Sequence, residues 1–68
     1  MSVASAAKSA RYWVMRARHC ERLRDYGNAA GLWFAAAESL PTQSTGRAWL
    51  LLRHERCAGR AQMRRSSA

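Results

Sequence analysis

The sequence has few of the features that usually hold a very small protein together. Among its 68 residues are one proline, two cysteines and four acidic residues. A chain of this length buries only about 60% of the surface that it exposes when unfolded, and such a core usually needs a disulfide, a metal or a second copy of the chain. Because only Cys20 and Cys57 could pair, and because no hydrophobic signal segment precedes the body of the chain, we expect a cytoplasmic protein without a disulfide-stapled scaffold.

Carboxylates and long apolar runs are also scarce. Four acidic residues, with no nucleophile motif and no phosphate-binding glycine loop, leave little for acid–base catalysis, so we expect no enzyme and no cofactor. The longest apolar run, Leu32 to Ala37, is far shorter than the roughly 20 residues of a membrane helix, so we expect no membrane partner. Basic residues are plentiful: Lys8 is the only lysine among 12 Lys and Arg, and the formal net charge is +8. This charge favours anionic partners, although many small arginine-rich proteins are basic without binding nucleic acid.

Residues that favour β-strands are few, so the chain is predicted to be all-α. Apart from Val3 and Val14, its β-branched residues are threonines. Apolar residues at spacings of four and three, Trp13 and Cys20 among them, predict an amphipathic first helix over roughly Val3 to Leu23. The opposite side of this helix is basic.

Asp25 and Pro41 bracket the second predicted helix. The Asp25 carboxylate can accept hydrogen bonds from amides one turn on, and the residue before Pro41 is pushed out of helical geometry. After a short polar connection, Ser44 or Thr45 can cap a third helix that runs to about Met63.

The three helices are predicted to form one domain over residues 1–63, with a flexible basic C-terminal tail over 64–68. The structural core is expected to comprise Trp13, Tyr26, Ala29, Ala30, Trp33, Trp49 and Cys57. Scattered exposed apolar residues are normal, but those off the core stripes exceed what so small a bundle can cover. They predict a surface for a partner protein or for self-association into a homodimer, made of Leu32, Phe34, Leu51, Leu52 and Arg53.

Two histidines and two cysteines could in principle form a tetrahedral zinc site: His19, Cys20, His54 and Cys57. His54 and Cys57 share a helical face, but His19 and Cys20 are adjacent and would project about 100° apart. Both cysteines also fall on apolar stripes, where a buried thiol behaves as a small hydrophobe. We therefore expect packed thiols and no metal.

The arginines of the third predicted helix support a second class of function. A stripe of basic side chains on one helix could enter the major groove of DNA, with arginine paired to guanine. The candidate nucleic-acid contacts are Arg53, Arg56, Arg60, Arg64 and Arg65. The helix lacks the asparagine or glutamine residues that commonly read adenine, so the same arginines could equally serve only to keep a small bundle in solution.

The segment from Asp25 to Pro41 resembles the second half of a tetratricopeptide unit, with Tyr26, Ala29, Leu40 and Pro41 at the expected places. We therefore expect a helical hairpin with the third helix packed across it. From Tyr12 to Arg60 the chain is more similar to the short bacterial AraC negative regulator family. The residues that carry this resemblance are Glu21, Arg22, Tyr26, Ala29, Ala30, Leu32, Trp33, Ala36, Trp49, Arg53 and Cys57. The chain departs from the family pattern at Cys20, where leucine is usual, and at Arg24, where a glycine normally opens the turn.

The resemblance implies a non-catalytic protein that binds AraC-type transcription activators and blocks their dimerisation or DNA binding. A central apolar patch with an arginine-rich rim suits such an antagonist, because tryptophan and arginine often dominate binding energy at interfaces. An inhibitor of another host protein, encoded by a virus or a mobile element, would use the same surface physics. This alternative and the nucleic-acid-binding module stay open at the level of sequence.

Overall fold

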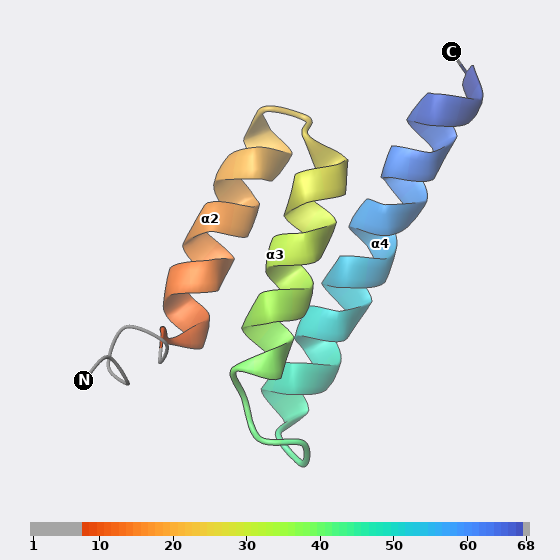
Figure 1. Cartoon of the computed structure of the whole chain (residues 1–68). Helices are drawn as coiled ribbons and strands as arrows, with labels where there is room; N and C mark the ends of the chain where they lie inside the picture. The colour runs from red at the N-terminus through yellow and green to blue at the C-terminus, as the bar shows by residue number, and fades with distance from the viewer. Residues whose placement is uncertain (1–7, 68) are drawn as a thin grey trace.

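The computed structural model describes residues 8–67, with side chains up to residue 63, and over this range the protein is helical and has no strand. The helices are α2 (Ala10–Arg22), α3 (Tyr26–Glu38) and α4 (Thr45–Ser67). They lie side by side with α3 in the middle, and each helix runs in the opposite direction to the one before it (Figure 1). The molecule measures 45 × 26 × 16 Å, and its smallest extent is little more than the diameter of one helix. The helices therefore form a flat layer, in which α4 lies alongside α3 and not across the α2–α3 hairpin.

Helix α2 begins at Ala10 and not at the predicted Val3. The Ser9 hydroxyl accepts a hydrogen bond from the amide of Tyr12 at 3.3 Å and so caps the first turn. This cap fixes the start of the helix, because the backbone of Ser9 is extended. The part of the predicted helix that precedes Lys8 lies outside the described residues.

The turn between α2 and α3 is a Schellman motif with an arginine at its left-handed position. Arg24 has a φ of 59°, a conformation that glycine adopts without steric cost. The amide of Asp25 donates to the carbonyl of Cys20 at 2.8 Å, and the amide of Arg24 donates to that of Glu21 at 2.9 Å. The departure from glycine noted in the sequence thus falls where glycine would be least strained, and the turn closes despite it.

Helix α3 begins after Asp25 as predicted, but the Asp25 side chain does not cap the helix as predicted. The Asp25 carboxylate makes no hydrogen bond to a helix amide, and instead accepts from the side-chain amide of Asn28 at 2.7 Å. At the other end the helix stops at Glu38, ahead of Pro41. The Arg47 guanidinium of α4 then donates to the carbonyl of Ala37 at 3.1 Å, so a cation satisfies the C-terminus of α3.

Helix α4 starts as predicted and ends later than predicted. The Ser44 hydroxyl accepts from the amide of Gly46 at 3.1 Å, which caps the first turn. The helix then runs to Ser67, beyond the predicted end at Met63. Residues 64–67 therefore continue α4 and do not form a separate tail, while Ala68 lies outside the described residues.

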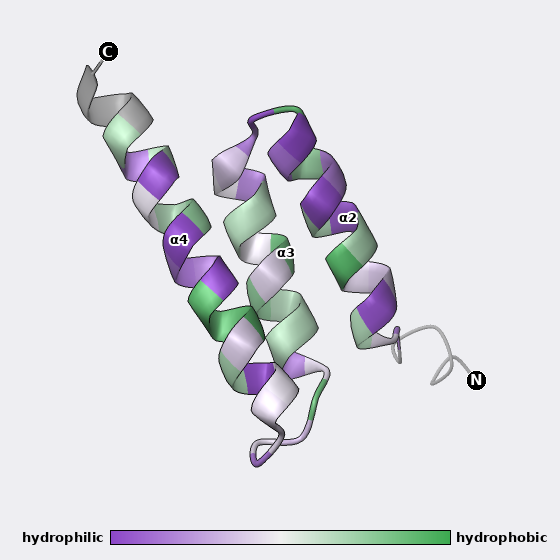
Figure 2. Ribbon diagram, turned by 180° about the vertical axis from the view of Figure 1, so that it is seen from behind, coloured by the Kyte–Doolittle hydropathy of each residue, from purple (hydrophilic) through white to green (hydrophobic). Residues whose placement is uncertain are grey.

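The core is built mainly from small side chains around one tryptophan. Trp33 is 1% exposed and is the largest fully buried side chain; the other buried residues are Ala17, Ala29, Ala30, Ala36, Ala37, Leu50 and Cys57. Alanines let the helices approach closely, and α3, which carries most of them, is the least polar of the three helices (Figure 2). The predicted core positions Ala29, Ala30, Trp33 and Cys57 are confirmed, and Trp13 and Tyr26 pack against them partly buried.

Trp49 is not a core residue, so its predicted placement was wrong. Its side chain is 54% exposed. Leu50, the next residue along α4, takes the buried position, and neighbouring side chains on a helix project about 100° apart. The Trp49 ring instead packs edge-on against Trp33 from outside, with ring centroids 6.0 Å apart and planes at 86°.

Candidate protein-interaction surface

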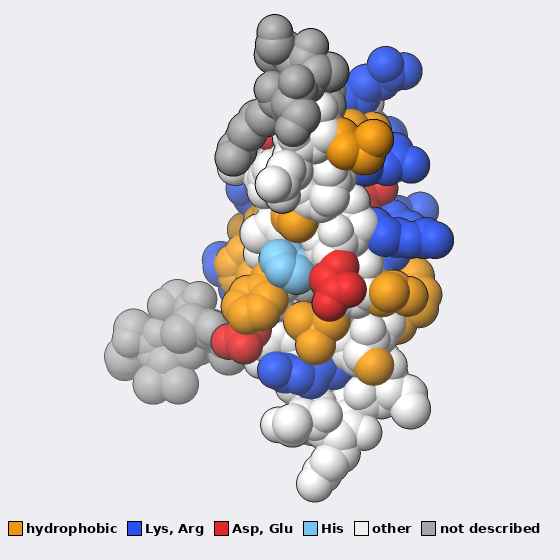
Figure 3. Space-filling view, turned by 90° about the vertical axis from the view of Figure 1, so that its right-hand side faces the viewer, with side chains coloured by type: hydrophobic (Ala, Val, Ile, Leu, Met, Phe, Trp, Pro, Cys, Tyr) orange, Lys and Arg blue, Asp and Glu red, His pale blue; other side chains and the backbone are white. Residues whose placement is uncertain are grey.

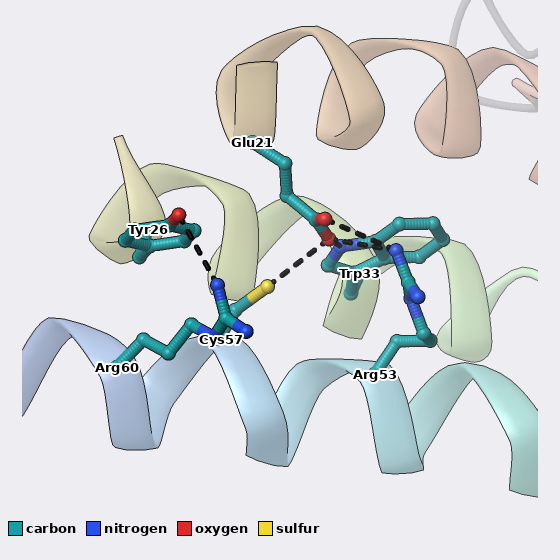
Figure 4. Close-up of polar contacts among 6 residues, drawn as sticks. All are labelled: Glu21, Tyr26, Trp33, Arg53, Cys57 and Arg60. Carbon is teal, nitrogen blue, oxygen red and sulfur yellow. Dashed lines mark hydrogen bonds and ion pairs between the residues drawn. The ribbon is translucent and has the colours of Figure 1, made fainter. Parts of the chain in front are cut away.

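A polar cluster around Glu21 joins all three helices (Figure 4). The Glu21 carboxylate, on α2, accepts a hydrogen bond from the indole nitrogen of Trp33 on α3 at 2.5 Å. It also accepts from Nη2 of Arg53 on α4, at 3.1 Å to one oxygen and 3.0 Å to the other, and from the thiol of Cys57 at 3.2 Å. One carboxylate therefore satisfies donors from two other helices.

The cluster shifts the pKa values of both acidic groups in it. Burial alone would raise the pKa of Glu21, but the hydrogen bonds from Cys57 and Trp33 and the charge of Arg53 outweigh burial, and the pKa lies below 4.5. Burial raises the pKa of the Cys57 thiol to about 11, assisted by its hydrogen bond to Glu21 and the negative charge there. Glu21 is thus charged and Cys57 is a neutral, weakly nucleophilic thiol at neutral pH.

Arg53 is held in this cluster and is only 30% exposed at its side chain. Its guanidinium lies over the Trp33 ring at 4.8 Å and near the Trp49 ring at 5.6 Å. Its Nε is buried and has no hydrogen-bond partner within the described residues, a desolvation cost that the Glu21 pair offsets. Both predicted roles of Arg53, as a partner contact and as a nucleic-acid contact, are weakened because its charge is already paired.

The five residues of the predicted interaction surface lie in different parts of the structure. Leu32 and Leu51 are partly buried against the core. Phe34 is 43% exposed and its ring lies 5.2 Å from that of His54. Leu52 is 54% exposed, on a different side of α4 from Leu51 because adjacent residues diverge.

The recesses of the molecule separate these residues further. Phe34 lines one recess with Lys8 and Trp13, whereas Leu32 lines another with Trp13 and Gly31. Arg53 lines a third, beside Glu21. The five predicted residues are therefore not one continuous patch.

A different set of residues does form one continuous strip along the outside of α4. We call it the α4 stripe, and it consists of Trp49, Leu52, Arg56, Gly59 and Met63. All five are exposed, with Trp49 and Leu52 at 54% and Met63 at 71%. Their spacings of three and four residues place them on one side of the helix. On the side of the molecule that α4 forms, apolar side chains alternate with basic ones along one edge (Figure 3).

The predicted nucleic-acid arginines have different surroundings. Arg60 lies over the Tyr26 ring at 5.4 Å and donates to its hydroxyl at 3.3 Å. Arg56 is exposed and makes no ion pair within the part of the chain that the structure describes. The side chains of Arg64 and Arg65 lie outside the described residues. Of the three arginines whose side chains are described, only Arg56 is unengaged.

Two of the four residues considered for zinc make hydrogen bonds to other groups. The Cys57 thiol donates to Glu21, and Nδ1 of His54 lies 2.8 Å from the carbonyl oxygen of Ala30. Among residues 8–67, no three histidine, cysteine or acidic side chains are grouped to hold a metal ion. Nor does any helix in the same range have the length and apolar character needed to cross a membrane.

Comparison with described protein families, curated proteins and solved structures finds no match to this chain. The family resemblance seen in the sequence therefore stays a prediction, and function has to be argued from the geometry. Several of the residues that carry the resemblance nevertheless meet in space, because Glu21, Trp33, Arg53 and Cys57 form the polar cluster. In this chain they hold the helices together.

Sequence reasoning missed Glu21 as the centre of the cluster, and although the sequence places Trp49, Leu52 and Met63 on one side of the third helix, only Leu52 of these entered the predicted surface. No local pattern points to Glu21, because its partners lie 12, 32 and 36 residues away. The stripe did leave a signal, the three-and-four spacing from Trp49 to Met63. Placing Trp49 in the core concealed it.

Proposed function

We propose that this chain is a cytoplasmic protein-binding regulator that antagonises a transcription activator, of AraC type by resemblance, by blocking its dimerisation or DNA binding. One observation supports this most: Trp49 and Leu52 are about half exposed beside Arg56, which makes no ion pair with any described residue. Tryptophan and arginine in one strip are the residues that contribute most to binding at protein interfaces. The polar cluster beneath keeps α4 in place, so the strip is preorganised.

The predicted homodimer would use another part of the surface. Phe34 and its neighbour His54 lie on the flank of α4 away from Trp49, and the recess beside Phe34 is partly apolar. Self-association there leaves the α4 stripe free. A dimer built from tetratricopeptide-like hairpins is thus compatible with partner binding on a separate surface.

The nucleic-acid alternative has less support. A module that reads DNA needs several free arginines, and Arg53 and Arg60 are engaged with Glu21 and Tyr26. A virus- or mobile-element-encoded inhibitor of a different host protein would use the same α4 surface as the main proposal.

The test is an in vitro competition with a purified AraC-type activator from the same genome, bound to its promoter DNA. The protein should release the activator from DNA at salt concentrations where the protein alone does not bind that DNA. A Trp49→Ala variant should lose this effect, and Met15→Ala, which alters a 66% exposed side chain on α2, should keep it. An activator that stays dimeric and DNA-bound at saturating protein would refute the proposal.

A further inference from the structure

The spacing of the α4 stripe is that of a helix that packs lengthwise against another helix. From Trp49 through Leu52, Arg56 and Gly59 to Met63, the steps are three, four, three and four residues. A seven-residue repeat of this kind keeps one seam facing a partner over several turns. Gly59 has no side chain, which allows another helix to approach closely, and nothing in the described structure covers this position.

Helix α4 is longer than α3, so the C-terminal part of α4 has no α3 beside it. Helix α4 has 23 residues and α3 has 13, which correspond to about 34 Å and about 20 Å of helix. The C-terminal part of α4 extends past the turn that joins α2 and α3 (Figure 1). Met63, the most exposed of the large apolar residues, lies in this part of the helix.

The charges along the seam restrict what can cover it. Arg56 stands in the middle of the stripe, and together with Arg53 and Arg60 it also lines the recess beside the polar cluster. Glu55, the only acidic residue of α4, projects about 100° away from Arg56 and borders the α4 stripe on the opposite side, beside Leu52 and Gly59. A partner that pairs with this seam therefore needs carboxylates beside its apolar residues.

A second copy of the chain does not meet that need. Pairing two α4 stripes about a two-fold axis would bring the Arg56 side chains of the two copies together, and like charges facing each other across an interface are costly. A phosphate backbone would satisfy Arg56 but would offer no apolar surface to Trp49, Leu52 and Met63. An amphipathic helix of another protein satisfies both kinds of residue.

We propose that the α4 stripe is a docking site for an acidic amphipathic helix, with apolar residues at heptad spacing flanked by glutamate or aspartate. This inference rests on the proposed function and deepens it by naming the element of the partner that is recognised. Apolar residues of the bound helix pack on Leu52 and Met63, and its carboxylates pair with Arg56.

The probe is a labelled synthetic peptide of four heptads with leucine at positions a and d and glutamate at e and g. Its glutamates disfavour self-pairing, so it is available to bind. Binding is followed by fluorescence anisotropy against two control peptides: one with lysine at e and g, and one of unchanged charge with serine at a and d. The acidic leucine peptide should bind at least about tenfold more tightly than either control. Equal binding of the acidic serine peptide would reduce the effect to charge alone and overturn the proposal.

Matched variants locate the binding on the protein. Leu52→Ser and Arg56→Glu should each weaken binding roughly tenfold. Leu23→Ser, at a 65% exposed side chain, and Arg18→Glu, at an exposed arginine of α2, should leave it nearly unchanged. The Arg18 control carries the same change in net charge, so equal losses in the two arginine variants would overturn the proposal. Circular dichroism verifies that every variant is folded.

Further measurements on the same variants test two other occupants of the α4 stripe, DNA and a second copy of the chain. If duplex DNA of random sequence displaces the peptide at 150 mM salt and Arg56→Glu abolishes DNA binding, the stripe is a nucleic-acid surface and the proposal fails. If the protein alone sediments as a dimer that Leu52→Ser dissociates and Leu23→Ser does not, the stripe is a self-association surface and the proposal fails. If Leu52→Ser still antagonises the activator, this inference fails while the proposed function stands. If the peptide binds as expected but the protein releases no activator from DNA, the docking site stands and the proposed function fails.

Discussion

Glu21 and Arg53, 32 residues apart in the sequence, form an ion pair that links α2 directly to α4, with both carboxylate oxygens at 3.0 to 3.1 Å from one guanidinium nitrogen. The buried Trp33 lies between them in the layer and donates to the same carboxylate. In a flat arrangement of three helices, α2 and α4 have α3 between them. The pair is therefore the main polar tie across the layer.

Removing this carboxylate should destabilise the fold more than an ordinary surface substitution. Glu21→Ala leaves Arg53 and the Trp33 indole without their acceptor, and we expect a loss of about 2 kcal/mol in the free energy of unfolding, less than for a fully buried pair because both side chains are partly exposed. Urea denaturation followed by circular dichroism measures it. Glu55→Ala, at an exposed carboxylate of α4, is the control and should cost little. Equal midpoints for the two variants would show that the pair contributes nothing.

Stability should fall in acid because the pKa of Glu21 is lowered in the folded protein. A lowered folded-state pKa contributes stability that is complete above the unfolded value, near 4.5, and is lost as the pH falls through the folded value. The free energy of unfolding should therefore decline below about pH 4.5. The decline should be shallower in Glu21→Gln, and identical slopes in the two proteins would assign the acid sensitivity to other groups.

Arg24→Gly should stabilise the protein. Glycine relieves the strain of a side chain at a φ of 59°, which is worth about 1 kcal/mol, less the entropy that glycine adds to the unfolded chain. Because the net gain is below about 1 kcal/mol, thermal unfolding should show a melting temperature that is higher by a few degrees at most. Arg22→Gly, inside the last turn of α2, is the contrasting variant and should lower it. A lower melting temperature for Arg24→Gly would mean that the arginine side chain contributes more than its strain costs.

The two tryptophans that touch each other should differ sharply when truncated. Trp33→Ala removes the largest buried side chain and should cost about 3–5 kcal/mol, enough to unfold so small a domain. Trp49→Ala removes a half-exposed ring and should cost about 1 kcal/mol, from the lost contacts with Trp33 and Arg53. Far-ultraviolet circular dichroism separates the two outcomes. An unfolded Trp49→Ala variant would restore that residue to the core.

The sequence predicted that there are three helices, and roughly where they lie, because the signals for a helix are local. The apolar spacing around Trp33, the position of Asp25 and the break before Pro41 each depend on a few neighbouring residues. Burial on α4 could not be predicted in this way. Trp49 and Leu50 are adjacent and both apolar, and only the position of α3 decides which of them faces inward.

The candidate site was harder still, because similar residues have different roles within it. Arg53 and Arg56 read as equivalent members of one basic stripe, yet a carboxylate far away in the sequence pairs with Arg53 and leaves Arg56 in solvent. Leu51 and Leu52 likewise diverge, one packed against the core and one exposed. Such differences depend on contacts between distant parts of the sequence and on how the helices pack, and local sequence patterns predict neither.

Nuclear magnetic resonance can show residue by residue whether the α4 stripe binds an acidic amphipathic helix. The isotope-labelled protein would be titrated with the acidic leucine peptide while backbone amide shifts are followed. We expect the largest shift changes at Leu52, Arg56, Gly59 and Met63, with those of Met15, Arg18 and His19 on α2 nearly unchanged. Shift changes centred on α2, or spread evenly over all basic residues, would show that the peptide does not dock on the α4 stripe.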